Sequence, residues 1–223
     1  MLEQYLSVLK HSKLFSGVGE DSLSAMLGCL QARTRAYVKN EYVLREGERL
    51  EEVCILLSGT LHVQQDDYWG NHTIFQRITS GELFGEAYAV PDSGAFPNDV
   101  VALEDSTVLF LNTRKILQVC SSACPFHCAV VRNLFITISE KNRHLTAKLG
   151  HLSQRTTREK LLSYLSEESK KHGSAEFDIP FNRQQLADFL SVDRSAMSAE
   201  LCRMRDEELL RFDRNHFVLL ETT

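Results

Sequence analysis

A stripe of apolar side chains along residues 131–152 constrains the possible structure of this 223-residue chain more than any other feature. The stripe alternates steps of four and three residues, which is the spacing of a coiled-coil seam, so it predicts one long helix that pairs with a second helix. The predicted seam consists of Val131, Phe135, Ile138, Asn142, Leu145 and Leu149, and the spacing continues to Leu152. A buried asparagine at such a position tends to set register and pairing. The pattern therefore predicts a homodimer, with packing on the chain's own β domain as the alternative.

Charge is unevenly distributed around this helix. Residues 1–112 carry 8 basic and 16 acidic side chains, residues 113–150 carry 6 and 1, and residues 151–223 carry 11 and 13. The net charge of −5 excludes a wholly basic nucleic-acid-binding protein, but it does not exclude a local basic face. We expect three parts, namely an effector-sensing domain, a connector with the dimerisation helix, and a C-terminal domain. Their predicted boundaries are 1–113, 114–152 and 153–223.

The sequence carries no sign of a membrane or secreted protein. No apolar run approaches the ~18 residues that a membrane-spanning helix needs, and the first ten residues lack the apolar core of a signal peptide. Six cysteines are too sparse for a disulfide scaffold. We therefore expect a cytoplasmic protein with no membrane partner.

Short β-type runs separated by glycines dominate residues 34–112. Many short strands with regular turn signals are typical of a β sandwich or barrel, and glycine allows the positive φ of tight corners. The expected strands are 34–39, 53–59, 60–65, 72–78 and 106–111. A short helix at about 114–120 and a long helix starting near Pro125 should follow, because proline suits a first helical turn. A further helix is expected at about 156–171, with Gly173 as its stop.

Residues 178–220 contain two short helices joined by a tight turn. Asn182 and Gln185 have the spacing of a capping box before a helix of about 183–190, and Asp193 can cap a second helix of about 194–208. Two helices with a three- or four-residue connection form a helix-turn-helix. The apolar residues that follow, on either side of residues 213–215, predict a β-hairpin wing.

The second of these helices has the surface that a major-groove reader needs. Its buried face should contain Met197, Leu201 and Met204, whereas small, polar and basic residues face away from it. Bulky side chains would hold such a helix away from the base edges, and an arginine can donate to guanine. The predicted DNA-binding residues are Asn182, Arg183, Gln184, Arg194, Ser195, Ser198 and Ala199, of which Arg183 and Gln184 suit phosphate contacts. The alternative is a helical hairpin used for protein contacts.

The chain resembles the CRP/FNR family of bacterial transcription regulators over essentially its whole length. The resemblance rests on Glu46-Gly47, Ser58-Gly59, the run Gly81–Glu86 and the block Asn182–Arg205, in this order. It implies an α+β fold in which an N-terminal double-stranded β-helix (jelly roll), a long dimerisation helix and a C-terminal winged helix-turn-helix follow one another. It also implies a homodimer that binds a pseudo-palindromic double-stranded DNA operator and responds to a signal, with RNA polymerase as a further partner.

The chain departs from the cyclic-nucleotide-binding members of that family. Those members carry an arginine that holds the cyclic phosphate, but here no Arg or Lys occurs between Arg77 and Arg114. A buried phosphate would lack a cationic partner, so cyclic AMP is not the expected effector. A neutral or aromatic small molecule fits the expected pocket better, and Glu86 has either a structural or a ligand-binding role. The expected pocket residues are Phe84, Glu86, Tyr88, Phe96, Asn98, Asn142 and Arg143.

Cysteine chemistry provides the alternative signal. The cluster Cys120, Cys124 and Cys128 could bind a metal or respond to redox state, although buried structural cysteines are common. No cysteine precedes Cys29, which argues against the N-terminal iron–sulfur cluster of the oxygen-sensing members. A regulator that needs no effector is the remaining alternative. No cofactor is therefore assigned from the sequence.

Other classes of protein fit the sequence less well. A metal-dependent jelly-roll enzyme needs two or three histidines with a carboxylate, whereas the β region offers only His62 and His72. An interaction module would leave the winged helix without a role. We therefore expect a regulator and not an enzyme.

Overall fold

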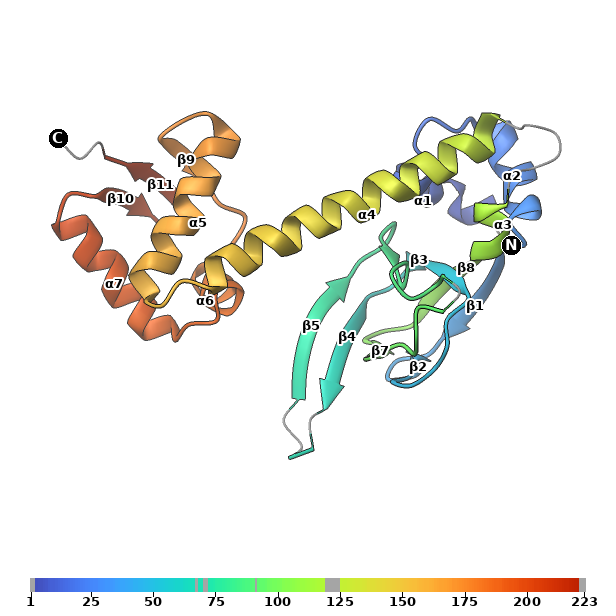
Figure 1. Ribbon diagram of the computed structural model, residues 1–223, viewed down its shortest axis with the longest axis horizontal. Helices are drawn as coiled ribbons and strands as arrows, with labels where there is room; N and C mark the ends of the chain where they lie inside the picture. The colour runs from blue at the N-terminus through green and yellow to red at the C-terminus, as the bar shows by residue number, and fades with distance from the viewer. Residues whose placement is uncertain (1–2, 67, 70–71, 91, 119–124, 221–223) are drawn as a thin grey trace. The chain divides into compact units, whose positions relative to one another are not determined.

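The computed structural model divides the chain into two compact units, residues 1–140 and 141–223 (Figure 1). The boundary lies within the long helix α4, Pro125–Leu152. The residues described are 3–66, 68–69, 72–90, 92–118 and 125–220.

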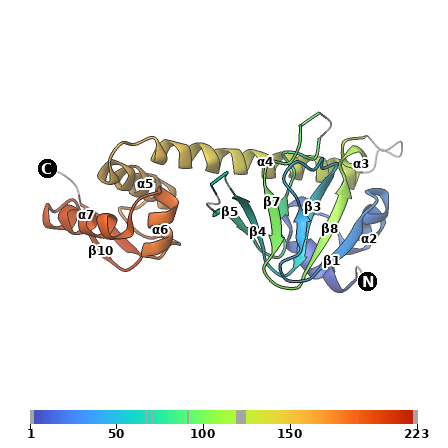
Figure 2. The same cartoon turned by 90° about the horizontal axis from the view of Figure 1, so that it is seen from below.

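The N-terminal unit contains two four-stranded antiparallel sheets that share one hydrophobic core. The strand orders are β1-β8-β3-β6 and β2-β7-β4-β5, and α2 lies at the β1 side of the unit (Figure 2). The strands are β1 Arg33–Tyr37, β2 Tyr42–Leu44, β3 Glu52–Ser58, β4 Leu61–Asp66, β5 His72–Ile78, β6 Leu83–Phe84, β7 Asp99–Ala102 and β8 Ser106–Asn112. The helices before α4 are α1 Leu6–His11, α2 Glu20–Cys29 and α3 Thr113–Leu117, with short 3-10 turns at Glu3–Tyr5 and Lys13–Phe15. This arrangement confirms the predicted β-rich N-terminal domain.

The central strand β3 shows why the sequence forms this core. Its residues 53–57 are all buried, and Cys54 pairs with Phe110 of β8 on one side and with Phe84 of β6 on the other. A strand with partners on both edges and apolar cover on both faces reads as a continuous apolar run, which made it visible in the sequence. The short strands β2, β6 and β7 were missed because two to four residues show no clear periodicity.

One face of α4 packs on the N-terminal unit. Val130, Leu134 and Thr137 are buried, and the side-chain amide of Asn133 donates to the carbonyls of Leu14 and Ser16 at 3.0 and 2.8 Å. Lys13 and Glu140 form an ion pair at 2.5 Å. The part of α4 up to Glu140 is therefore held to the N-terminal unit by a face other than the predicted seam.

The seam itself is exposed. Phe135 is 71% exposed, Leu145 62% and Leu149 67%, Val131 and Ile138 are also exposed, and Asn142 is exposed between them. Val131, Phe135 and Ile138, which belong to the same unit as the two β sheets, are thus not covered by that unit. Large apolar side chains at a regular spacing on one helix face are typical of an interaction surface.

The C-terminal unit is a winged helix-turn-helix with its own core. Helix α5, Thr157–His172, begins with a capping box between Thr156 and Glu159 and ends at Gly173, which has φ +62°. The helices α6 Arg183–Leu190 and α7 Arg194–Asp206 follow β9, Glu176–Asp178. The strands β10 Leu210–Asp213 and β11 His216–Leu219 form the predicted hairpin, and β9 pairs with β11.

Two helix ends differ from the prediction. Helix α7 ends at Asp206 and not near residue 208, because Glu208 has φ +58° and turns the chain out of the helix. Helix α3 ends at Leu117 and not at residue 120, since Gln118 has an extended backbone with ψ 125°. Neither difference moves a predicted DNA-binding residue.

Candidate nucleic-acid interface

The helix pair α6–α7 is held by local caps and a shared core. The Asn182 side chain accepts from the Gln185 amide at 3.0 Å, and the Gln185 side chain accepts from the Asn182 amide at 2.9 Å. Asp193 caps α7 by accepting from the Ala196 amide at 2.7 Å. The turn between the helices contains Ser191 with φ +50°. These contacts confirm the predicted capping box and the predicted Asp193 cap.

Six buried side chains hold the two helices together. They belong to one cluster and consist of Leu186, Ala187, Leu190, Met197, Leu201 and Met204. Their burial leaves the opposite side of α7 free to face a ligand. The predicted internal face of α7 is confirmed.

The opposite side of α7 exposes small side chains near its N-terminus. Ser195 and Ala199 are exposed, and Ser198 is half-buried and donates to the Arg194 carbonyl at 2.9 Å. A helix with such short side chains can approach base edges closely. The structure thus brings Arg194, Ser195, Ser198 and Ala199 together on one surface.

Arg194 differs from the other arginines of this helix. Arg203 pairs with Glu200 at 3.0 Å, and Arg205 pairs with Asp206 at 2.9 Å. Within the described part of the chain, the exposed Arg194 guanidinium forms no ion pair or hydrogen bond. Its five N–H donors are therefore available to an incoming ligand.

Arg183 has a packing role that the sequence did not predict. Its guanidinium lies over the rings of Phe212 and Phe217 in the wing, at 4.7 and 5.1 Å from their centroids. Burial lowers the pKa of Arg183, and one of its terminal nitrogens is buried without a hydrogen-bond partner among the described residues. The side chain joins α6 to the wing, whereas Asn182 and Gln184 are exposed. Gln184 donates to Asp188 at 2.8 Å.

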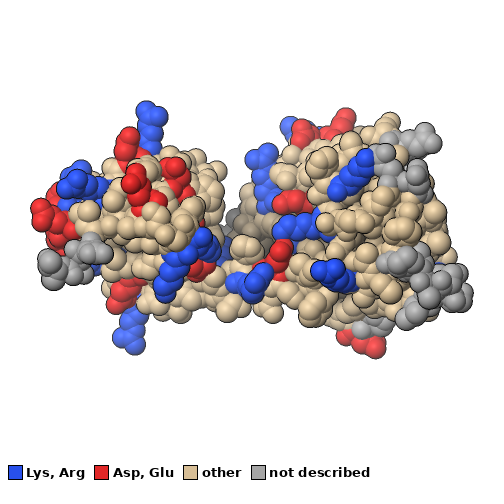
Figure 3. All heavy atoms as spheres, turned by 90° about the horizontal axis from the view of Figure 1, so that it is seen from above, with Lys and Arg blue, Asp and Glu red and all other residues tan. Residues whose placement is uncertain are grey.

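Basic and acidic side chains are mixed on the surface. On the face drawn in Figure 3, Lys and Arg alternate with Asp and Glu over both units. A DNA contact made through this face would therefore depend on particular side chains rather than on one uniformly basic surface.

Five of the seven predicted effector-pocket residues lie in the N-terminal unit. Phe84, Glu86 and Phe96 are buried, and Tyr88 packs edge-on against Phe96 with ring centroids 5.2 Å apart. Asn98 is half-buried. Asn142 and Arg143 are exposed residues of the C-terminal unit. The aromatic part of the predicted set thus lies in or beside the core, where its packing role is evident.

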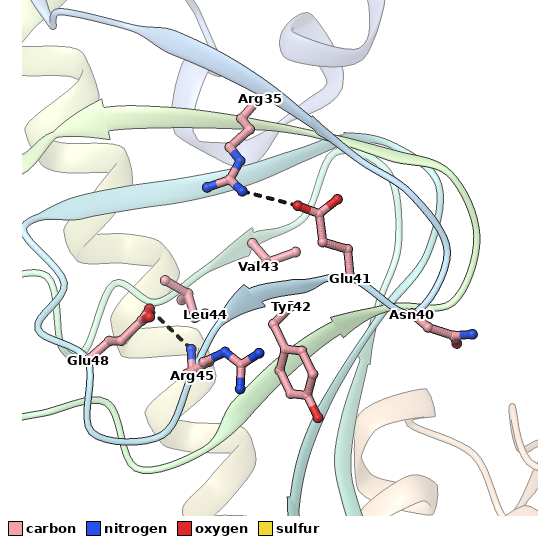
Figure 4. A pocket seen from close by; sticks show the side chains of 8 residues that line it. All are labelled: Arg35, Asn40, Glu41, Tyr42, Val43, Leu44, Arg45 and Glu48. Carbon is pink, nitrogen blue, oxygen red and sulfur yellow. Dashed lines mark hydrogen bonds and ion pairs between the residues drawn. The ribbon is translucent and has the colours of Figure 1, made fainter.

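A hollow of about 600 Å³ lies beside β2 (Figure 4). Arg35 donates to Glu41 at 3.1 Å, and the Arg45 backbone amide donates to Glu48 at 3.2 Å. Its lining residues are Arg35, Asn40, Glu41, Tyr42, Val43, Leu44, Arg45 and Glu48. None of the predicted pocket residues lines it, and its acidic groups already have partners.

The cysteine hypothesis falls largely outside the described residues. Cys120 and Cys124 lie outside them, whereas Cys128 is exposed on α4. Among the residues that are described, no group of three or more potential metal ligands occurs. Burial raises the pKa of the Cys54 thiol, and the carboxylates of Glu52 and Glu86 raise it further, so this thiol is protonated and unreactive.

Comparisons with known protein families match both units. Residues 34–123 match the cyclic nucleotide-binding domain, and residues 159–222 match the Crp-like helix-turn-helix domain. Human cGMP-dependent protein kinase 2 is 28% identical over 117 residues, which is 52% of this chain and only 15% of the kinase. The likeness to the kinase therefore concerns one segment of that much longer protein.

Solved structures share the fold over nearly the whole chain. The catabolite activator protein of Thermus thermophilus is 20% identical with a TM-score of 0.51, and the match covers 94% of each chain. The c-di-GMP-responsive regulator CLP of Xanthomonas campestris is 17% identical with a TM-score of 0.54, covering 91% of this chain and 100% of CLP. At this level of identity the likeness shows the fold alone.

Among the described residues, none of the helices combines the length and the apolarity that crossing a bilayer requires.

The two matched families follow the order that the fold shows, a nucleotide-binding-type β domain followed by a Crp-like DNA-binding domain. The chain therefore joins a cyclic nucleotide-binding domain to a Crp-like helix-turn-helix domain, which is the domain combination of the CRP/FNR transcription regulators.

Proposed function

We propose that two copies of this chain bind a pseudo-palindromic DNA operator, with one α7 helix in the major groove of each half-site. The observation that carries this proposal is the surface of α7, where short side chains surround an arginine that has no partner among the described residues. Arginine donates in a bidentate manner to guanine, and recognition helices use their N-terminal residues to contact base edges. Asn182 and Gln184, exposed at the start of α6, suit contacts with phosphates.

The dimer is proposed from the exposed stripe on α4. Leu145 and Leu149 lie in the same compact unit as α7, so pairing of two such helices would bring two reading helices together. Operators with two-fold symmetry require this arrangement, because each copy reads one half-site. RNA polymerase is the further partner that the family resemblance suggests.

Replacement of Arg194 by alanine tests the DNA-reading role. We expect operator affinity to fall by about 1–3 kcal/mol, which is roughly 5- to 150-fold, with relaxed preference at one base position in each half-site. The measurement is selection of binding sites from random DNA followed by titration of single-base operator variants. Lys170→Ala, which removes an exposed charge from the end of α5, is the control and should change affinity little.

Two results would contradict this role. Equal weakening on every DNA sequence would make Arg194 a phosphate contact, with a lower salt dependence as its signature. Unchanged affinity and unchanged base preference would remove Arg194 from the interface altogether.

We also propose that the β domain binds a neutral or aromatic small molecule at Phe84, Glu86, Tyr88, Phe96 and Asn98. The absence of Arg and Lys between Arg77 and Arg114 disfavours a cyclic phosphate. Saturating cyclic AMP should therefore change neither thermal stability nor operator affinity. A molecule that native mass spectrometry finds bound to the purified protein should be lost from Glu86→Gln and Phe96→Leu variants. Retention in both, or a cyclic AMP response, would overturn the pocket proposal.

A further inference from the structure

A histidine is buried in the last turn of α4, inside the C-terminal unit. His151 is only 4% exposed, and both of its ring nitrogens have partners on α5. Nδ1 lies 2.8 Å from the Ser163 hydroxyl oxygen, and Nε2 lies 3.1 Å from Oε2 of Glu167. Because residues 163 and 167 are one helical turn apart, the two contacts define the orientation of the ring.

The ring also packs into an aromatic cluster that reaches the first helix of the DNA-binding pair. Tyr164 contacts His151 edge-on at 5.7 Å between centroids, and Phe189 of α6 lies 6.3 Å away. Phe189 in turn contacts Tyr164 at 5.5 Å and Phe181 at 4.9 Å. One turn earlier on α4, the Lys148 ammonium lies 5.3 Å from the Phe189 ring centroid. The end of α4 is therefore attached to both α5 and α6.

The polar contacts do not depend on the charge of the imidazole. A carboxylate only accepts, so Nε2 donates its N–H to Glu167, whereas a serine hydroxyl can either donate to Nδ1 or accept from it. The neutral and the protonated ring can thus make the same two contacts. Glu167 has a second partner in Lys171 at 2.8 Å, which lowers the pKa of Glu167 and keeps it ionised as an acceptor. The two hydrogen bonds therefore hold the His151 ring in one orientation against α5.

We propose that His151 is a positioning residue that sets the angle between the end of the dimer helix and the reading helix α7. The inference rests on the proposed dimeric DNA binding. The seam residues Leu145 and Leu149 and the helix α7 belong to one compact unit, and His151 joins the seam-bearing helix to the rest of that unit. In a dimer, this angle determines the distance between the two α7 helices and hence the half-site spacing that the protein accepts.

A panel of operators with altered spacing tests this inference. The panel keeps both half-sites and lengthens or shortens the spacer by single base pairs, and affinities are measured for wild type, His151→Leu, His151→Gln and the exposed-residue control His144→Leu. We expect wild type and His144→Leu to prefer one spacing. His151→Leu, which keeps the side-chain bulk but removes both polar contacts, should reduce that preference by about fivefold or more. His151→Gln keeps a donor for Glu167 and should retain part of the preference.

The possible outcomes distinguish a positioning role of His151 from a mere effect on protein stability and from failure of the proposed DNA binding. An unchanged spacing preference in His151→Leu overturns the proposal, and so does an equal loss of affinity on every operator, including a single half-site. Should His151→Leu fail to fold, Ser163→Ala removes one polar contact and is held to the same expectation. Failure of the wild-type protein to bind any DNA would instead refute the proposed function.

Discussion

Replacing Leu145 and Leu149 together with aspartate should convert the proposed dimer into a monomer and weaken operator binding by about 10²- to 10⁴-fold. The two leucines are 62% and 67% exposed in the single chain, so the substitutions should leave its fold intact. In a paired helix they would place four carboxylates in an apolar seam, where unpaired charge is costly. The loss of affinity follows because two linked half-site contacts exceed one by a factor of this order.

Sedimentation and operator titration measure this result. Thr146→Asp is the matched control, since it adds a carboxylate to the same turn of α4 but one position away from the stripe. The control should remain dimeric with nearly unchanged affinity. A double variant that stays dimeric would show that the seam lies elsewhere and would remove the main support for the proposed dimer.

Replacing Gly59 with alanine should destabilise the N-terminal unit by about 2–5 kcal/mol. Gly59 has φ +92° in the connection between β3 and β4, and an added Cβ would lie 2.8 Å from both the Asp105 carbonyl oxygen and the Ser106 Cα atom. These are backbone atoms, which cannot rotate away as a side chain can. Backbone strain and a steric clash therefore add to each other.

Urea unfolding followed by circular dichroism measures the change in the free energy of unfolding. Fluorescence would report little, because the single tryptophan, Trp69, is 82% exposed. Gly94→Ala separates the two causes, since Gly94 has φ +87° but nothing within 4 Å of its added Cβ. The control should lose only about 1–2 kcal/mol from strain. Equal losses in both variants would show that the clash is relieved by a backbone shift.

Local interactions explain which parts of the structure could be predicted. The caps by Asn182 and Asp193 each join residues three apart in the chain, so their residue types and spacing carry the whole signal. The seam on α4 is likewise a repeat along one helix. The long buried strand β3 was visible as an apolar run, whereas the two-residue strand β6 exists only because it pairs with β3.

Long-range contacts explain what could not be predicted. The role of Arg183 depends on Phe212 and Phe217, about thirty residues away, and no spacing rule connects them. The same holds for His151, whose burial results from α5 and α6 folding against the end of α4. The predicted pocket residues could be named from a family resemblance, but their burial and the edge-on contact of Tyr88 with Phe96 required the folded unit.

The sequence by itself determined the order of the parts, the helix caps, the buried face of α7 and the existence of an apolar stripe along α4. These properties follow from periodicity and from contacts between residues a few positions apart, and both can be read directly from the sequence. Only the tertiary structure decided which arginine remains available, which histidine joins α4 to the winged helix, and which face of α4 packs on the β domain. These features depend on contacts between side chains that are distant in the sequence, and such contacts form only when the chain is folded.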